Sequence, residues 1–215
     1  MTRALVVRGG WDGHFPTEST DLFLPLLRAH GEVTVSETLD TYADPALGGF
    51  DLIVQCWSMG ELTPEQEHGL TTAVRAGTGF AGWHGGVLAT MYPNLDYGFM
   101  VGGRFVAHPG EVIDYRVEIL DEHDVVAGIA SFDVRSEQYF CHTDPVIDVH
   151  ATTTFSGAHG TPEIAGAVVP VVWTRRYGSG RVFVSTLGHL PEEFDNPPTR
   201  TITERGLLWA ARRAE

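Results

Sequence analysis

Apolar residues in the first half of the chain gather in short runs that are bounded by glycine, arginine or other polar residues. Runs of this length are typical of strands that are covered on both faces. One further segment alternates between apolar and polar residues, which indicates a strand with one face toward solvent. We therefore predict buried strands at residues 4–7, 51–56 and 79–83, and an alternating strand at residues 32–37.

Helical patterns occupy the stretches between these strands. Residues 17–30 carry leucine and phenylalanine at helical spacing, although Pro25 predicts a late start or a kink. Residues 63–77 open with Thr-Pro-Glu-Gln, a capping-box sequence with proline in the first turn. A further short helix is expected over residues 84–91.

Strands that are separated by helices of this length predict a parallel sheet with right-handed crossovers. We therefore expect an α/β fold with a flavodoxin-like, doubly wound parallel sheet. No internal repeat and no linker-like stretch interrupts residues 1–215, which predicts a single domain.

The second half of the chain has a more β-like pattern. Residues 112–120 alternate, residues 146–155 are rich in β-branched side chains, and both segments predict strands. Residues 168–176 and 181–186 flank a Tyr-Gly-Ser-Gly turn and predict a β-hairpin added to the sheet. A final helix is predicted at residues 201–213, opened by a Thr-x-x-Glu capping box.

The charge balance restricts the partners of the chain. Its 28 acidic residues outnumber 14 arginines, which gives a formal net charge of −14, and the sequence contains no lysine. A surface that binds nucleic acid needs a dense cationic face, so we expect no nucleic-acid partner. The missing lysine also excludes a P-loop and a lysine Schiff base, and we expect no nucleotide cofactor.

Two cysteines, Cys56 and Cys141, are too few for a disulfide framework. The apolar run at the N-terminus is too short for a signal peptide, and no stretch approaches the length of a membrane span. These observations predict a cytoplasmic protein without a membrane partner.

Candidate chemistry lies where predicted strands end, because doubly wound sheets bind ligands beyond the carboxyl ends of their strands. Residues 82–86 (Gly-Trp-His-Gly-Gly) place His84 on a tight elbow, where hydrolases carry their nucleophile. We expect a catalytic or ligand role for His84, with capping of the next helix as the alternative. Backbone amides at strand ends suit an anion or a sugar hydroxyl, and an indole ring there can stack on a sugar. The candidate substrate-binding residues are Gly10, Trp11, Trp57 and Gly85, with core packing as the alternative for Trp57.

Two further segments carry polar groups in the second half. Residues 102–110 hold Arg104 and His108 among glycines that permit close backbone approach; Arg104 is a candidate for substrate binding, and a simple surface turn is the alternative.

In an extended segment over residues 135–145, Glu137 and Tyr139 share one face and His142 lies on the other. Either Glu137 with Tyr139 or His142 would then lead a site, unless the segment bends. A polar loop that is held by its own hydrogen bonds is the alternative.

The last candidate segment, residues 185–193, follows the predicted hairpin. His189 comes after a glycine and has glutamates just downstream, which suits a general base with an orienting acid. Imidazoles also bind divalent metals such as Zn, Mn or Ni. The candidate metal ligands are His84, His108, His142 and His189.

Together these motifs resemble the ThuA-like family, which is named for trehalose utilisation. The resemblance rests on residues 82–86, 102–110, 136–139 and 170–189 and runs across nearly the whole chain. It implies a fold similar to the class I glutamine amidotransferases. Those enzymes carry a nucleophilic cysteine at the elbow that corresponds to His84, so amide hydrolysis by that route is not expected here.

The association of the family with sugar catabolism implies a carbohydrate ligand such as a sugar or a keto-sugar. Our leading hypothesis is a sugar-processing enzyme in which His84, His189, Glu137 and Tyr139 are catalytic. A bound metal would polarise a carbonyl or a water; without a metal, His189 would act as the base and His84 or Tyr139 as the hydrogen-bond donor.

Two other hypotheses stay open at this point. The chain is alternatively a non-catalytic sugar-binding module or a partner subunit of an enzyme, and it is able to form a homo-oligomer. A cysteine hydrolase that uses Cys141 beside His142 is disfavoured, because adjacent residues on a strand point to opposite faces.

Overall fold

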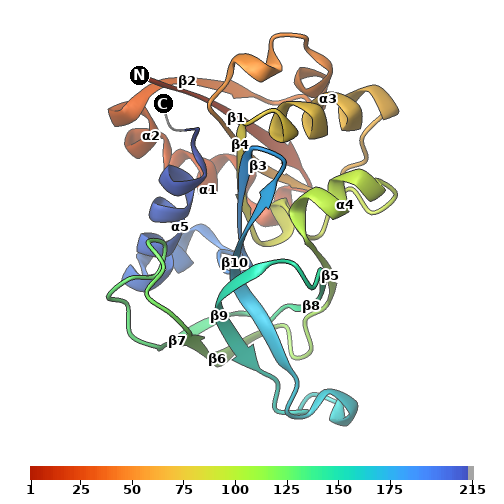
Figure 1. The fold of residues 1–215 in the computed structure, drawn as a ribbon. Helices are drawn as coiled ribbons and strands as arrows, with labels where there is room; N and C mark the ends of the chain where they lie inside the picture. The colour runs from red at the N-terminus through yellow and green to blue at the C-terminus, as the bar shows by residue number, and fades with distance from the viewer. Residues whose placement is uncertain (213–215) are drawn as a thin grey trace.

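Nine strands form one mixed sheet in the computed structural model, which describes residues 1–212 (Figure 1). The parallel part has the order 2-1-3-4-5 of flavodoxin-like sheets when its strands are numbered among themselves. These strands are β2 (Gly31–Ser36), β1 (Thr2–Gly10), β3 (Leu52–Ser58), β4 (Gly79–Trp83) and β11 (Gly180–Ser185). The predicted strands of the first half are therefore confirmed.

Antiparallel strands continue the sheet beyond β11 in the order β10 (Val168–Tyr177), β9 (Asp148–Thr154), β6 (Val112–Ile119) and β7 (Phe132–Glu137). The segments that were expected as an added hairpin are β10 and β11, which pair with each other. However, β11 also pairs in parallel with β4. The segment therefore belongs to the central sheet and is not an appendage. A separate two-stranded sheet joins β5 (Gly103–Ala107) to β8 (Phe140–Thr143).

Helices cover both faces of the parallel strands (Figure 1). On one face lie α1 (Pro16–Asp21), α2 (Leu24–His30) and α5 (Pro197–Ala210), and on the other lie α3 (Pro64–Arg75) and α4 (Leu95–Val101). Alternate residues of β1 enter two separate cores: Ala4 and Val6 pack in the core that contains α2 and α5, and Leu5 and Val7 in the core that contains α3. Burial on both faces explains why this strand is a continuous apolar run.

Local sequence signals locate the helix starts with mixed success. The predicted capping box of α3 is confirmed, with Thr63 and Gln66 each bonded to the backbone of the other. The predicted helix at residues 17–30 is split between α1 and α2, because Pro25 lacks the N–H that a continuous helix needs and lies in the first turn of α2. After β4 the chain makes only the 3-10 turn η4 (His84–Gly86), so the longer helix predicted there is wrong.

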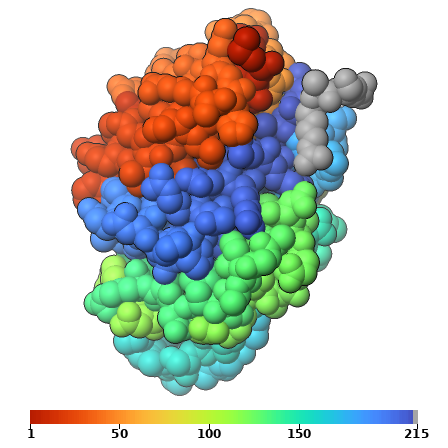
Figure 2. Space-filling view, turned by 90° about the vertical axis from the view of Figure 1, so that its left-hand side faces the viewer, coloured from red at the N-terminus to blue at the C-terminus, as the bar shows by residue number. Residues whose placement is uncertain are grey.

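The C-terminal helix begins four residues earlier than its sequence pattern indicates. Asn196 caps α5 by accepting a hydrogen bond from the Thr199 N–H at 3.3 Å, so the predicted cap at Thr201 is wrong. Residue 213, the predicted last residue of the helix, lies outside the described residues. Figure 2 shows the C-terminal segment between the N-terminal part of the chain and the strands of the second half. Within residues 1–212, the helices are too short or too polar to cross a bilayer.

Candidate functional site

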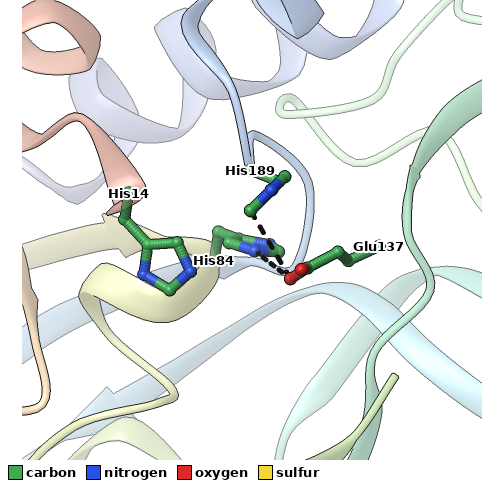
Figure 3. Close-up of side chains that lie close together, drawn as sticks. All are labelled: His14, His84, Glu137 and His189. Atoms are coloured by element: carbon green, nitrogen blue, oxygen red, sulfur yellow. Dashed lines mark hydrogen bonds and ion pairs between the residues drawn. The ribbon is translucent and has the colours of Figure 1, made fainter. Parts of the chain in front are cut away.

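Four titratable side chains from distant parts of the sequence meet beyond the carboxyl ends of the parallel strands (Figure 3). His14 follows β1 on the 3-10 turn η1 (Asp12–His14), His84 follows β4, and His189 follows β11. Parallel strands bring these three positions to one edge of the sheet. Glu137 arrives from the last residue of β7, so the antiparallel half of the sheet curves back toward this edge. We call this set the His/Glu cluster.

His84 occupies a strained elbow. Its φ of 50° lies in the left-handed region, which non-glycine residues rarely adopt. The Nδ1 atom lies 2.8 Å from the Thr186 carbonyl oxygen and must donate to it, while Nε2 lies 3.1 Å from Glu137 Oε2. A neutral imidazole carries only one N–H. Contact between Nε2 and the carboxylate is therefore favourable in two arrangements. Either Nε2 carries a second N–H and donates it to Glu137, or Nε2 and Glu137 bind the same cation.

The Glu137 carboxylate lies at the centre of the arrangement. Besides His84, its Oε2 faces His189 Nδ1 at 3.5 Å, and its Oε1 faces His108 Nε2 at 3.9 Å. Burial alone would raise the pKa of Glu137, but the hydrogen bond from His84 and the positive charges of the three imidazoles lower this pKa to about 2. The carboxylate is therefore ionised at neutral pH.

His14 is the member of the cluster that the sequence analysis missed. Its ring is buried, and Nδ1 contacts Ser58 Oγ at 2.5 Å, which leaves Nε2 for another partner. Burial, followed by repulsion from His84 and His189, lowers the pKa of His14 to about 3. Gly85 is needed beside it, because a Cβ at this position would overlap the His14 ring. The available signal was its place directly after β1, in a glycine-rich segment at the same edge as His84.

His189 is held by a carboxylate that contacts its backbone. Glu193 Oε2 accepts hydrogen bonds from the His189 N–H at 3.0 Å and the Gly188 N–H at 3.2 Å, and from Ser136 Oγ at 2.7 Å. Burial raises the pKa of Glu193. The orienting acid expected downstream of His189 is thus present, but it fixes the loop and not the ring. The His189 ring faces Glu137, and its pKa is lowered by burial and by His84.

Tyr139 lies beside His84 and Glu137 in the same site. The Tyr139 ring lies 4.0 Å from the His84 ring between centroids and is almost fully buried. Burial raises the pKa of Tyr139, which keeps the phenol protonated. The segment after β7 leaves the strand conformation at residues 138–139, so Glu137 and Tyr139 both approach His84.

A buried polar network supports the elbow from below. The Gln55 amide donates to the Gly86 carbonyl at 2.9 Å and to the Tyr97 hydroxyl at 2.7 Å, and its oxygen accepts from Tyr42 at 2.8 Å. Satisfied buried networks of this kind hold a single geometry. The elbow that carries His84 is therefore held by Gln55 on β3, which is itself fixed by Tyr42 and Tyr97.

Comparison with known proteins assigns the chain to a family. The model of the ThuA family, described as trehalose utilisation, matches residues 3–210. The chain belongs to the ThuA family. No curated protein matches it.

Solved structures show the same fold. A putative ThuA-like protein from Bacteroides uniformis has a TM-score of 0.77 at 16% identity, and the match covers 97% of this chain and 91% of that one. A second, from Parabacteroides merdae, has the same TM-score and identity, with 100% and 92% covered. A cytoplasmic protein from Salmonella typhimurium LT2 has a TM-score of 0.67 at 15% identity, with 99% and 100% covered. At these identities the likeness concerns the fold alone.

In this ThuA-family chain, only some of the candidate residues predicted from sequence lie together. His84, His189, Glu137 and Tyr139 come together, and His108 faces the other oxygen of the Glu137 carboxylate. Gly10 and Trp11 lie at the end of β1, where the half-exposed Trp11 ring contacts the His14 ring at 4.8 Å. Trp57 is partly buried against the core on the α3 side, as the packing alternative supposed.

Arg104 and His142 lie elsewhere. They are register partners on β5 and β8 and line a separate, open hollow of about 370 Å³ with Asp144. His142 belongs to neither of the ligand-type clusters found within residues 1–212. The strand β8 turns its side chain outward while the preceding Cys141 is buried, so His142 and Tyr139 do not serve one site.

Both cysteines are buried thiols, and burial outweighs the charge of Arg8, which acts in the opposite direction on Cys56. Burial raises the pKa of Cys56 and that of Cys141 to about 12 in each case. The thiolate is the reactive form, so this environment opposes a nucleophilic role at neutral pH. Cys141 is buried and His142 exposed, which agrees with the opposite faces predicted for them.

The His/Glu cluster fits a divalent cation. Its ligand-type atoms all lie within 4.8 Å of one another, and they comprise three imidazoles and one carboxylate. Nδ1 of His189 is buried and makes no hydrogen bond with the described residues. The Nδ1–H of His84 donates to a backbone carbonyl, which is the usual second contact of a metal-binding histidine. Imidazole and carboxylate are ligands of Zn²⁺, Mn²⁺ and Ni²⁺.

Proposed function

We propose that this ThuA-family chain is an enzyme of carbohydrate metabolism that acts on a sugar or a keto-sugar at the His/Glu cluster. The observation that carries the proposal is the ionised Glu137 carboxylate held between His84 and His189, at the ligand-binding edge of a doubly wound sheet. The family's link to trehalose utilisation supports a carbohydrate as the ligand. The net charge of −14 supports a partner other than nucleic acid, and we assign the protein to the cytoplasm.

The side chains of the cluster have distinct roles in this proposal. In the protein without a bound cation, His189 is the general base, because burial lowers its pKa and favours an unprotonated ring at neutral pH. The rim position of His189, with 13% of its side chain exposed, lets it reach a bound molecule. Tyr139 remains protonated and serves as a hydrogen-bond donor toward a sugar oxygen. Glu137 stabilises the positive charge that His189 acquires when it takes up a proton.

We further propose that the cluster holds one divalent cation through His14, His84, Glu137 and His189. When bound, such a cation supplies Lewis-acid polarisation of a carbonyl or a water oxygen. The sequence-based ligand set of His84, His108, His142 and His189 is thereby revised: His14 and Glu137 replace His142 and His108.

The test is turnover by purified, tag-free protein. Trehalose and its keto derivatives are incubated with protein that has been loaded in turn with Zn²⁺, Mn²⁺ or Ni²⁺ or treated with a chelator, and products are followed by NMR. We expect turnover that His189→Ala abolishes, with an unchanged circular dichroism spectrum. His68→Ala, an exposed position on α3, is the matched control and retains activity.

The outcomes separate the hypotheses. Turnover retained in His189→Ala overturns the assignment of the base. Turnover that survives complete metal removal refutes the cation and leaves the acid–base mechanism. Tight sugar binding without any product, in the loaded and the metal-free protein alike, refutes the enzyme and supports the alternative of a sugar-binding or partner subunit.

A further inference from the structure

The two oxygens of the Glu137 carboxylate face two different groups of ligand-type side chains. Oε2 is directed at His84 and His189, at 3.1 and 3.5 Å. Oε1 accepts no hydrogen bond from the described residues and faces His108 Nε2 at 3.9 Å. The glutamate side chain itself is nine-tenths buried. This oxygen is therefore available to a further positive group, and a carboxylate in so enclosed a place is stabilised by one.

A second ligand-type group lies on the Oε1 side. His108, Glu111 and Glu137 bring ligand atoms within 4.8 Å of one another, and Glu137 is the one residue that they share with the His/Glu cluster. Glu111 Oε2 lies 3.6 Å from His108 Nδ1, and this Nδ1 is buried without a hydrogen-bond partner among residues 1–212. The polar atoms of this group are thus poorly satisfied by one another.

We propose that Glu137 bridges two cations, so that the site is a two-metal centre. The first cation is the one proposed above for His14, His84, Glu137 and His189, and the new inference rests on it. The second is held by Glu137 Oε1, His108 and Glu111. Carboxylates that join paired cations are a recurring feature of enzymes that act on oxygen-rich substrates, in which two cations bind the reacting oxygens.

The local structure keeps His108 and Glu111 in place for this role. The His108 ring stacks on Phe105 with a 5.4 Å centroid distance and a 27° interplanar angle. The Glu111 N–H donates to the His108 carbonyl at 3.1 Å, which closes a turn. Gly110 permits the turn, because its φ is +91° and a Cβ there would lie 2.7 Å from the His159 ring. The Glu111 side chain remains 82% exposed and is free to rotate toward a cation.

The geometry predicts unequal affinities. Ligand atoms around a tetrahedral cation lie about 3.3 Å apart when each bond is about 2.0 Å. The contacts of Glu137 Oε2 at 3.1 and 3.5 Å bracket this spacing, whereas those of His108 at 3.6 and 3.9 Å exceed it. The second site has fewer protein ligands and lies nearer the surface. It should bind more weakly and leave coordination positions for water or sugar oxygens.

The test uses Mn²⁺ alone as the probe, so it does not depend on knowing the substrate. Chelator-treated protein is titrated with Mn²⁺, with bound metal counted by elemental analysis after equilibrium dialysis and by electron paramagnetic resonance. We expect two equivalents, the second at least tenfold weaker, and dipolar broadening of the spectrum when both are bound. His108→Gln and Glu111→Gln should each reduce the count to one and remove the broadening.

Two comparisons make the result decisive. Glu65→Gln, an exposed position on α3, is the control for loss of a surface carboxylate and should still bind two equivalents. A single equivalent in the unmodified protein overturns the second site while leaving the first cation intact. Two equivalents in both His108→Gln and Glu111→Gln place the second ion elsewhere and also overturn it. No binding at all refutes both cations, whereas the acid–base role of His189 is then judged separately by turnover.

Discussion

Replacing His14 by glutamine should make the protein markedly less sensitive to mild acid. His14 is buried with 7% of its surface exposed, and burial together with repulsion from His84 and His189 lowers its pKa to about 3. In the unfolded chain the same ring has a pKa of about 6.5. Between these values the unfolded state binds a proton that the folded state does not. Stability must therefore fall as the pH falls through this window.

The size of the expected loss in unfolding free energy depends on how much of the pH range between the two pKa values the experiment covers. Each pH unit between the two pKa values costs about 1.4 kcal/mol of unfolding free energy for one such group. Lowering the pH from about 6.5 to about 4.5 should thus cost about 3 kcal/mol through His14 alone. The lower limit is chosen because Glu137, whose pKa is lowered to about 2, adds its own loss of stability as the pH falls below its unfolded value and toward 2.

The assay is urea unfolding followed by tryptophan fluorescence at pH 7.5 and pH 4.5, with a chelator present throughout. The unmodified protein should lose about 3 kcal/mol more than His14→Gln between these conditions. His189, whose pKa is also lowered, contributes a background loss to both proteins. His68→Gln, which removes an exposed histidine, should behave as the unmodified protein does. Equal losses in the unmodified protein and His14→Gln would refute the reasoning.

Three further predictions test the packing around the site, a helix boundary and the reactivity of a thiol. Gly85→Ala should lower the free energy of unfolding by about 1–3 kcal/mol, because its Cβ would overlap the buried His14 ring. Gly48→Ala is the control, because a Cβ there has open space and should be nearly neutral; equal unfolding midpoints for the two variants would contradict the close contact at Gly85. Asn196→Ala should cost about 1 kcal/mol through loss of the helix cap, and Thr201→Ala less; a larger loss at Thr201 in denaturant unfolding would return the cap to that residue. Cys141, with its pKa raised to about 12 by burial, should resist iodoacetamide at pH 7.5 until urea is added, and rapid native labelling seen by mass spectrometry would show an activated thiol.

Features that depend on a few neighbouring residues could be predicted from the sequence. The uniformly apolar run of β1 indicates a strand that is buried on both faces, and the capping box at Thr63 indicates a helix start. Both signals lie within a few residues of chain. The cap at Asn196 was missed because two candidate caps lie close together. The sequence did hold a local signal for the correct one, because Pro197 and Pro198 follow Asn196 and proline is favoured in the first turn of a helix.

The site shows the same division. Placing His84 on an elbow needed only the strand before it and the glycines around it, and parallel strand order then carried His189 to the same edge. That Glu137, 53 residues beyond His84, would contact it depends on how the antiparallel half of the sheet curves back. His142 is the opposite case. The sequence made it a candidate metal ligand, but the pairing of β8 with β5 places its side chain in a separate hollow beside Arg104.

The sequence alone therefore determined the α/β class, the parallel edge and the positions of His84 and His189 after two of its strands, since hydrophobic period and strand ends are local properties. Only the tertiary structure decided that His14 and Glu137 complete the cluster and that Glu137 presents its second oxygen to His108. The direction of a side chain in a loop and the return of a distant strand arise from packing between segments far apart in the chain. No spacing within a single segment encodes them.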